Sequence, residues 1–228
     1  MSIVLLKKMR GESAREYVFR VLKSNIINLN LKPGQSISEQ EIADELNVSR
    51  TPIREAFIKL SQEELLEVYP QKGTSVSLIN MALVEEGRFV RTTLEKTVVR
   101  LACDKFWSEK LMLELEENMN MQEFNVSIKN YIKLMELDQK FHRIIFKACK
   151  KERTCSLIED MNSDFYRIRV LRLKAIIDMD SFLSQHKEIM YAIKNKDAER
   201  AEKAMEIHLT SVQSDQEVVK KEYAHLVK

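Results

Sequence analysis

Residues 31–60 read LKPGQSISEQEIADELNVSRTPIREAFIKL, and the first half of this stretch predicts a short helix. Pro33 and Gly34 favour a turn before it. Ser38 is followed three residues later by Glu41, which is the spacing of a capping box at a helix start. Asn47 can adopt the left-handed backbone conformation that ends a helix. A helix of about two turns is therefore expected between Ser38 and Asn47.

The second half of the stretch predicts a second helix, with Ser49 as its N-terminal cap. Pro52 lies in the first turn, where its missing N–H does no harm. Apolar side chains between Ile53 and Leu60 recur with helical spacing, so one face of the helix is expected to be buried. Two short helices joined by a turn of about four residues form the helix-turn-helix pattern.

The flanking residues complete a domain around these two helices. A longer amphipathic helix is expected over residues 11–29. After the second helix, residues 66–69 and 74–79 have strand character and are separated by the turn QKG at 71–73. A β-hairpin in this place is a wing, so we predict a winged helix-turn-helix domain over residues 1–79.

The start of the second helix carries chemistry that suits DNA. Arg50, Thr51 and Arg54 cluster there, and this end of a recognition helix meets base edges in the major groove. The planar guanidinium of arginine can pair with guanine O6 and N7. The helix N-terminus and the hydroxyl groups of Ser49 and Thr51 can hold a backbone phosphate.

Any DNA site must be a local cluster of cations, because the domain as a whole is not basic. Residues 1–78 hold 11 Lys and Arg against 10 Asp and Glu, and the chain has a formal net charge of +2. Lys72 and Gly73, at the wing tip, are expected to approach the adjacent minor groove. The alternative is an ordinary solvated helix end, but the order of helix, turn, arginine-bearing helix and wing favours DNA binding.

The second half of the chain predicts an all-helical domain over residues 80–228. From Met81 onward there is no proline and a single glycine, Gly87. The six expected helices run roughly over 82–106, 109–124, 126–149, 152–178, 180–195 and 197–221. The fold class is thus mainly α, with an N-terminal winged helix-turn-helix and a C-terminal helical bundle.

Cysteine usage and the N-terminus indicate a cytoplasmic protein. Cys103, Cys149 and Cys155 are odd in number and lack CxxC spacing, which favours reduced thiols. The apolar run IVLL precedes the first lysines, the reverse of the order in a signal peptide. No run reaches the roughly 18 apolar residues of a membrane span.

Four side chains of the second half could hold a metal ion. Asp138 and His142 are four apart and share one face of a predicted helix, while His186 and His208 lie on two later helices. An aspartate with three histidines suits a divalent cation such as Zn, Ni or Mn. The alternative is a set of ordinary core or surface histidines, and only the fold can bring the distant ones together.

Residues 31–60, followed by LLEVYPQKGTSVS, resemble the DNA-binding domain of the GntR family of transcription regulators. The resemblance covers about 50 residues and includes the PG turn and the KG wing. It implies a homodimer that binds palindromic double-stranded operators. The residues it places at DNA are Arg50, Thr51, Arg54 and Gly73. Some relatives have arginine where this chain has Gln40, so the readout by Gln40 is expected to differ, and Glu64 stands where the family usually has glycine.

The segments LDQKFHRIIF and SQHKEIMYAIKNKDAERAEKAMEIHL are similar to the FCD-type effector domain of the FadR subfamily. This resemblance implies a bundle of six or seven helices that binds a metal and a small carboxylate effector. The metal ligands it implies are Asp138, His142, His186 and His208. Arg91 corresponds to a residue that can grip the carboxylate of the effector. The alternative for Arg91 is a salt bridge with Glu95, four residues on.

The expected function is a ligand-responsive, DNA-binding transcription regulator and not an enzyme. A bound organic acid would bias the placement of the two DNA-binding domains of a dimer. Two other functional classes are the alternatives. A metal-dependent hydrolase or lyase would need a general base or nucleophile that no motif supplies. A helical adaptor would use the winged helix only to dock on other proteins.

Overall fold

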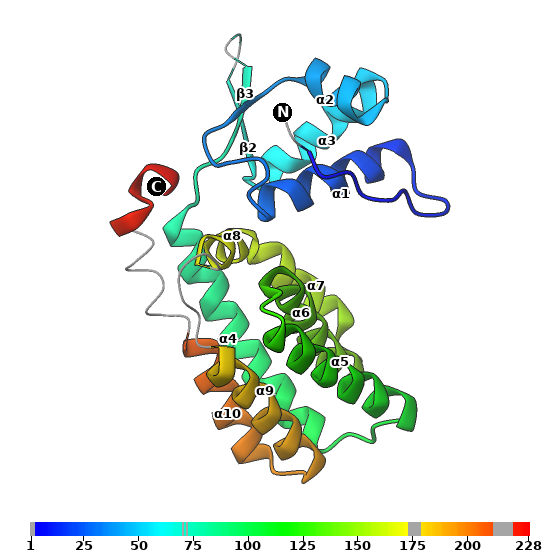
Figure 1. Cartoon of the computed structure of the whole chain (residues 1–228), viewed down its shortest axis with the longest axis vertical. Coiled ribbons are helices and arrows are strands. Elements are labelled where there is room, and N and C mark those ends of the chain that lie inside the picture. The colour runs from blue at the N-terminus through cyan, green and yellow to red at the C-terminus, as the bar shows by residue number, and fades with distance from the viewer. Residues whose placement is uncertain (1–2, 70, 72, 173–178, 212–220) are drawn as a thin grey trace. The chain divides into compact units, whose positions relative to one another are not determined.

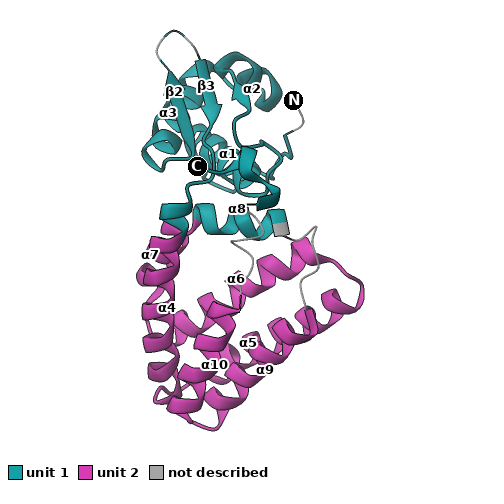
Figure 2. Cartoon of the chain, turned by 90° about the vertical axis from the view of Figure 1, so that its left-hand side faces the viewer, with its two compact units in different colours: residues 1–84, 163–171, 219–228 teal, residues 85–162, 172–218 magenta. Residues whose placement is uncertain are grey.

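The computed structural model describes residues 3–69, 71, 73–172, 179–211 and 221–228. Most of the chain is helical, and one small sheet lies near the N-terminus (Figure 1). The chain divides into two compact units (Figure 2). Residues 1–84, 163–171 and 219–228 form what we call the winged-helix unit, and residues 85–162 and 172–218 form the helical unit. The expected fold class is confirmed.

Three helices of the winged-helix unit form where the sequence predicts them. They are α1 (Ala14–Ile27), α2 (Glu39–Leu46) and α3 (Arg50–Gln62). Ser38 caps α2 by accepting a hydrogen bond from the Glu41 amide, and Asn47 ends it with a φ of 51°. Ser49 precedes α3 but makes no side-chain capping bond. The three helices pack around buried aliphatic side chains such as Leu22.

The wing belongs to a three-stranded antiparallel sheet. Its strands are β1 (Ser36–Ile37), β2 (Leu66–Tyr69) and β3 (Gly73–Val76), in the order β1-β3-β2. The hairpin of β2 and β3 was expected, whereas β1 was not. Two residues are too few for an alternating pattern to show, and β1 forms because β3 offers it an edge.

Segments from the far end of the chain complete the winged-helix unit. Residue Ile79 pairs with the C-terminal residues, accepting a hydrogen bond from the Lys228 amide and donating one to the Leu226 carbonyl. Helix α8 (Ser163–Arg172) contributes Arg167, which is fully buried and donates to the Ser77 carbonyl. The unit is therefore built from three separate stretches of sequence.

The helical unit is a bundle of long helices around one core. They are α4 (Met81–Cys103), which enters from the winged-helix unit, α5 (Glu109–Ser127), α6 (Tyr131–Ala148), α7 (Glu152–Met161), α9 (Met179–Lys194) and α10 (Ala198–Thr210). Buried residues such as Val99, Phe141 and Ile189 form the core. The three cysteines are buried and free. No helix among the described residues is both long and apolar enough to cross a membrane.

The single helix expected over 152–178 is interrupted. Helix α7 ends at Met161 and α8 begins at Ser163. Between them, the Asn162 side chain donates to the carbonyls of Ile158 and Gly87, at 2.7 and 3.4 Å. A side-chain amide that competes for backbone carbonyls in this way ends a helix. Residues 173–178, and residues 212–220 of the last predicted helix, lie outside the described residues.

Candidate metal centre and DNA-binding surface

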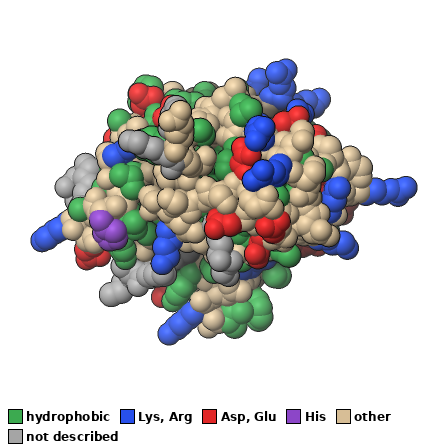
Figure 3. All heavy atoms as spheres, turned by 90° about the horizontal axis from the view of Figure 1, so that it is seen from above, with side chains coloured by type: hydrophobic (Ala, Val, Ile, Leu, Met, Phe, Trp, Pro, Cys, Tyr) green, Lys and Arg blue, Asp and Glu red, His purple; other side chains and the backbone are tan. Residues whose placement is uncertain are grey.

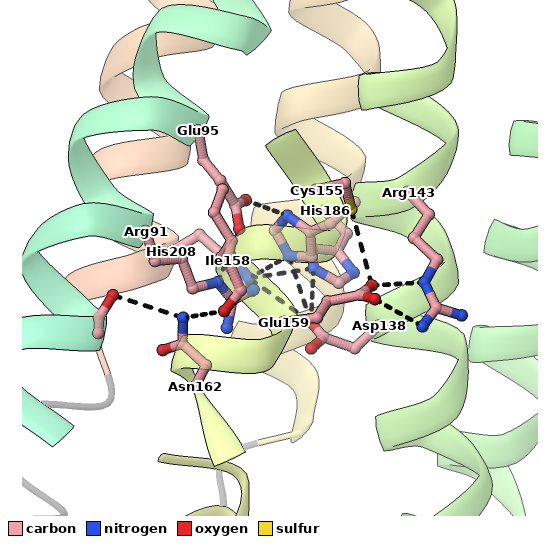
Figure 4. A network of polar contacts seen from close by, with 12 residues as sticks. Arg91, Glu95, Asp138, Arg143, Cys155, Ile158, Glu159, Asn162, His186 and His208 are labelled. Atoms are coloured by element: carbon pink, nitrogen blue, oxygen red, sulfur yellow. Dashed lines mark hydrogen bonds and ion pairs between the residues drawn. The ribbon is translucent and has the colours of Figure 1, made fainter. Parts of the chain in front are cut away.

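The fold brings the four predicted metal ligands together inside the helical unit. Asp138 and His142 lie one turn apart on α6, while His186 comes from α9 and His208 from α10. All four are buried, and their ligand atoms lie within 4.8 Å of one another. Figure 4 shows the Asp138, His186 and His208 side chains converging on one point between these helices.

The distances in this cluster are those that ligands of one ion show. Asp138 Oδ1 lies 3.5, 3.3 and 3.6 Å from the Nε2 atoms of His142, His186 and His208. His208 Nε2 lies 3.3 and 3.2 Å from the Nε2 atoms of His142 and His186. Ligand atoms about 2.1 Å from a shared ion are about 3.0–3.6 Å apart for angles of 90–120°. The residues present therefore fit a divalent cation.

Electrostatics favour the same conclusion. Burial, reinforced by the neighbouring His186, lowers the pKa of His208 to about 3, so this ring is neutral and able to ligate. Burial alone would also lower the pKa of His142, but Glu95 outweighs it, and the pKa of His142 lies above its ordinary value. Imidazole lone pairs and a carboxylate that converge away from water need a cation, either a proton or a metal, among them.

Each histidine also has a partner on its other ring nitrogen. His142 Nδ1 contacts Glu95 Oε2. His186 Nδ1 lies 2.7 Å from Gln122 Oε1, and His208 Nδ1 lies 3.1 Å from Gln185 Oε1. Partners of this kind orient metal-binding histidines and fix which nitrogen carries the proton. Gln122 and Gln185 were not among the predicted site residues. A polar residue at a core position of a predicted helix was the signal available.

Arg91 and Glu95 form the buried ion pair that was the alternative for Arg91. Arg91 Nε donates to Glu95 Oε1 at 2.7 Å, one turn away on α4 (Figure 4). Burial by itself would raise the pKa of Glu95, but Arg91 and His142 lower it to about 2. Arg91 therefore binds one oxygen of the Glu95 carboxylate, and the other oxygen contacts His142. Its contact with an effector stays a prediction.

The predicted DNA-contacting residues lie on the surface of the winged-helix unit. Ser49, Arg50, Thr51 and Arg54 are exposed at the start of α3, and Gln40 is exposed on α2. Basic side chains stand in several separate groups, with acidic ones among them (Figure 3).

Some of these exposed side chains have partners within the unit. Arg54 makes two hydrogen bonds to Glu39, at 3.1 and 3.0 Å, and Gln40 donates to Asp44 at 2.7 Å. Gly73, at the wing, has a φ of +100° and open space around it. Lys72 lies outside the described residues.

Comparisons with known proteins match a known family to each of the two predicted domains. Residues 14–76 match the family described as bacterial regulatory proteins, gntR family, and residues 88–211 match the FCD domain family. The HTH-type transcriptional repressor RspR of Escherichia coli (strain K12) is 30% identical over 211 residues, which is 92% of each chain. YdhC of Bacillus subtilis (strain 168), described as an uncharacterized HTH-type transcriptional regulator, is 29% identical and covers 83% of this chain and 85% of its own.

Two solved structures share the fold. E. coli McbR/YncC has a TM-score of 0.79 at 21% identity, covering 93% of this chain and 99% of its own. A putative transcriptional regulator GntR from Rhodococcus sp. RHA1 has a TM-score of 0.74 at 19% identity, covering 91% of this chain and 98% of its own. At these identities the likeness concerns the fold alone.

Proposed function

The chain belongs to the gntR family of bacterial regulatory proteins and carries an FCD domain, and from this premise we propose a cytoplasmic, homodimeric regulator whose operator affinity responds to a small carboxylate held at a metal centre. We assign DNA binding to residues 1–79, and effector binding and dimerisation to residues 80–228. The matched families and named relatives are transcription regulators, so the hydrolase or lyase alternative is rejected. The gntR match likewise argues against a mere adaptor.

The observation that carries the DNA-binding part is the exposed N-terminal end of α3, which presents Arg50, Thr51 and Arg54 just ahead of the wing. We propose that the two arginines contact bases and that Ser49 and the helix end bind phosphate. The ion pair of Arg54 with Glu39 is exposed, so exchanging it for a base contact costs little. Gln40, Lys72 and Gly73 are proposed to contribute at the edges of this surface.

Operator binding tests this assignment. DNA fragments would be selected from a random pool by the wild-type protein, and their affinities for Arg50→Ala and Arg54→Ala measured at fixed salt concentration. Loss of one base-contacting arginine should weaken binding by about 1–3 kcal/mol, roughly 5- to 150-fold. Arg153→Ala, at an exposed arginine of the helical unit, is the control. Unchanged binding by both α3 variants would remove the proposed role.

The metal part rests on the spacing and burial of Asp138, His142, His186 and His208, which would hold Zn, Ni or Mn. A bound ion supplies a Lewis acid that can accept an effector carboxylate. Native mass spectrometry of the full-length protein should show a dimer carrying one metal ion for each chain. Asp138→Ala with His208→Ala should lose the ion and the effector response while the dimer persists. A double variant that kept both would contradict the proposal.

We propose that Arg91 serves the effector as well as Glu95. The Arg91 guanidinium lies beside the Glu95 carboxylate, and the planar fork of a guanidinium suits the carboxylate of an organic acid. An acid that prefers one arrangement of the dimer would shift operator affinity by about 1–3 kcal/mol. Arg91→Lys, which keeps the charge but not the fork, should retain the metal and weaken the response to candidate organic acids. An unaltered response would leave Arg91 with its structural role alone.

A further inference from the structure

Helix α5 places two buried amides between the backbone of α6 and the metal centre. Asn118 and Gln122 lie one turn apart, and their exposed fractions are 2% and 0%. Asn118 Nδ2 donates to the Leu137 carbonyl at 3.1 Å, and Gln122 Nε2 donates to Asn118 Oδ1 at 2.7 Å. Gln122 Oε1 then lies 2.7 Å from His186 Nδ1. The three contacts form an unbroken line from a backbone carbonyl to a ligand imidazole.

The Leu137 carbonyl decides which group donates and which accepts in each of these hydrogen bonds. A backbone carbonyl can only accept, so Asn118 must present its NH2 group to Leu137 and its oxygen to Gln122. Gln122 must then present its NH2 group to Asn118 and its own oxygen to the histidine. An amide oxygen accepts only, so the proton of His186 has to be on Nδ1. The neutral ring is left with its lone pair on Nε2, the atom that lies 3.3 Å from Asp138 Oδ1.

Aromatic neighbours hold the ring in this orientation. Phe141 stacks on His186 with centroids 4.2 Å apart and an interplanar angle of 13°, and Phe182 lies at 4.5 Å. A fully buried ring between two aromatic side chains cannot turn over without displacing them. Position and tautomer of His186 are therefore set by residues that are not ligands.

We propose that Asn118 and Gln122 are positioning residues that fix the His186 proton on Nδ1 and so keep its Nε2 lone pair directed at the metal position. This inference rests on the metal centre of the proposed function. An apolar core would not need two buried amides in α5, and the inference gives these amides a role in orienting a metal-binding histidine.

The tautomer is tested first, in the metal-free full-length protein. Long-range 1H–15N correlation spectra at a pH where His186 is neutral should show its proton on Nδ1. Gln122→Met removes the acceptor, and Asn118→Leu leaves Gln122 in place but free to turn; both should populate the other tautomer. Asn125→Ala, at another buried α5 amide, whose side chain donates to the Met121 carbonyl, should not. Wild-type His186 carrying its proton on Nε2 would overturn the inference.

Zinc affinity, measured by chelator competition, is the second readout. Loss of such a partner weakens metal binding by about 10- to 100-fold, which is expected for Gln122→Met. Gln122→Glu keeps an oxygen toward His186 whether or not it is ionised, so it should retain zinc affinity to within about threefold even though the buried acid lowers stability. Asn125→Ala should lower stability without changing affinity.

The two readouts separate a positioning role from a structural one. Affinities that simply follow the thermal stabilities of these variants would overturn the inference, as would a Gln122→Met protein that binds zinc like the wild type. A wild-type protein that bound no zinc, nickel or manganese would instead contradict the proposed metal centre. The 1H–15N spectra would still decide whether Asn118 and Gln122 set the tautomer of His186.

Discussion

Each histidine of the candidate metal centre has different contacts at its two ring nitrogens. The Nε2 atoms face one another around Asp138, and the Nδ1 atoms face outward to Glu95 and two glutamines. The sequence could nominate the ligands, because their residue types and a family resemblance pointed to them. It could not identify the glutamine partners. A polar residue at a core position can mark Gln122, but Gln122 and His186 lie 64 residues apart, so the sequence does not show that they meet.

At the scale of single residues, removing the Glu95 carboxylate should be more damaging than removing its whole ion pair. Glu95→Ala leaves Arg91 buried without its carboxylate, which costs about 3–5 kcal/mol of unfolding free energy. Replacing both residues, as Arg91→Met with Glu95→Gln, removes the buried cation as well and should cost less. Urea unfolding of the metal-free proteins measures the difference. Equal losses in the two variants would contradict this account.

The same pair gives a pH dependence with a definite sign. The pKa of Glu95 is lowered from 4.5 to about 2 by Arg91 and His142, against the effect of burial. A depressed carboxyl pKa stabilises the fold above the unfolded value and loses that contribution as pH falls through the folded one. The stability gap between wild type and Glu95→Ala should therefore shrink between pH 4.5 and 2. A gap that widened in this range would show that the ionised carboxylate is not the stabilising form.

At the scale of elements, the helices with local signals were the predictable ones. Ser38 and Asn47 mark the ends of α2 within the sequence itself. The break between α7 and α8 has no comparable local signal, because Asn162 ends α7 partly by reaching Gly87, 75 residues away on α4. Strand β1 was missed for a related reason, since its pairing partner lies in β3. Elements defined by distant contacts escape a local pattern.

Gly87 should prove intolerant of a side chain despite its place within a helix. A Cβ there would lie 2.9 Å from the Met161 carbonyl oxygen and 3.0 Å from Asn162 Oδ1. Alanine gains about 1 kcal/mol of helix propensity over glycine, but overpacking against backbone costs typically 1–3 kcal/mol. Because a carbonyl in the last turn of α7 cannot swing aside as a flexible side chain can, overpacking should outweigh the gain and Gly87→Ala should be destabilising by up to about 2 kcal/mol.

Thermal unfolding of the full-length protein checks the Gly87 prediction. Thr93→Ala, at an exposed position of the same helix, is the matched control and should change stability by less than about 0.5 kcal/mol. A Gly87→Ala protein as stable as the wild type would mean that the close approach of α4 and α7 is not tight.

At the scale of the whole molecule, the sequence predicted the kinds of unit but not the path of the chain between them. Hydrophobic periodicity and sequence motifs predict both the winged helix and the helical bundle. The return of α8 and of residues 219–228 to the winged-helix unit does not, because the pairing of Ile79 with Leu226 spans 147 positions and has no sequence signature. The four candidate metal ligands were likewise predicted one by one, and only the helical bundle brings them together.

The buried ion pair of Arg167 and Asp164 holds α8 in the winged-helix unit. Arg167 donates to Asp164 Oδ1 at 2.7 Å and to the Ser77 carbonyl, and Asp164 Oδ2 accepts from the Asn80 amide at 2.9 Å. Both residues therefore hold α8 against residues 77–80, which follow the wing. Asp164→Ala would leave the Arg167 cation buried without its carboxylate and the Asn80 amide without its acceptor, at a cost of about 3–5 kcal/mol.

Hydrogen exchange in the full-length protein can locate that loss. Because the pair lies wholly in the winged-helix unit, Asp164→Ala should speed exchange of the Ile79 and Lys228 amides, whose hydrogen bonds depend on the same packing. Core amides of α6 should keep their rates. Lys133→Ala, which breaks an exposed ion pair with Glu136, should change neither region. Faster exchange spread evenly over both units would mean that they unfold as one body and that α8 does not belong to the winged-helix unit alone.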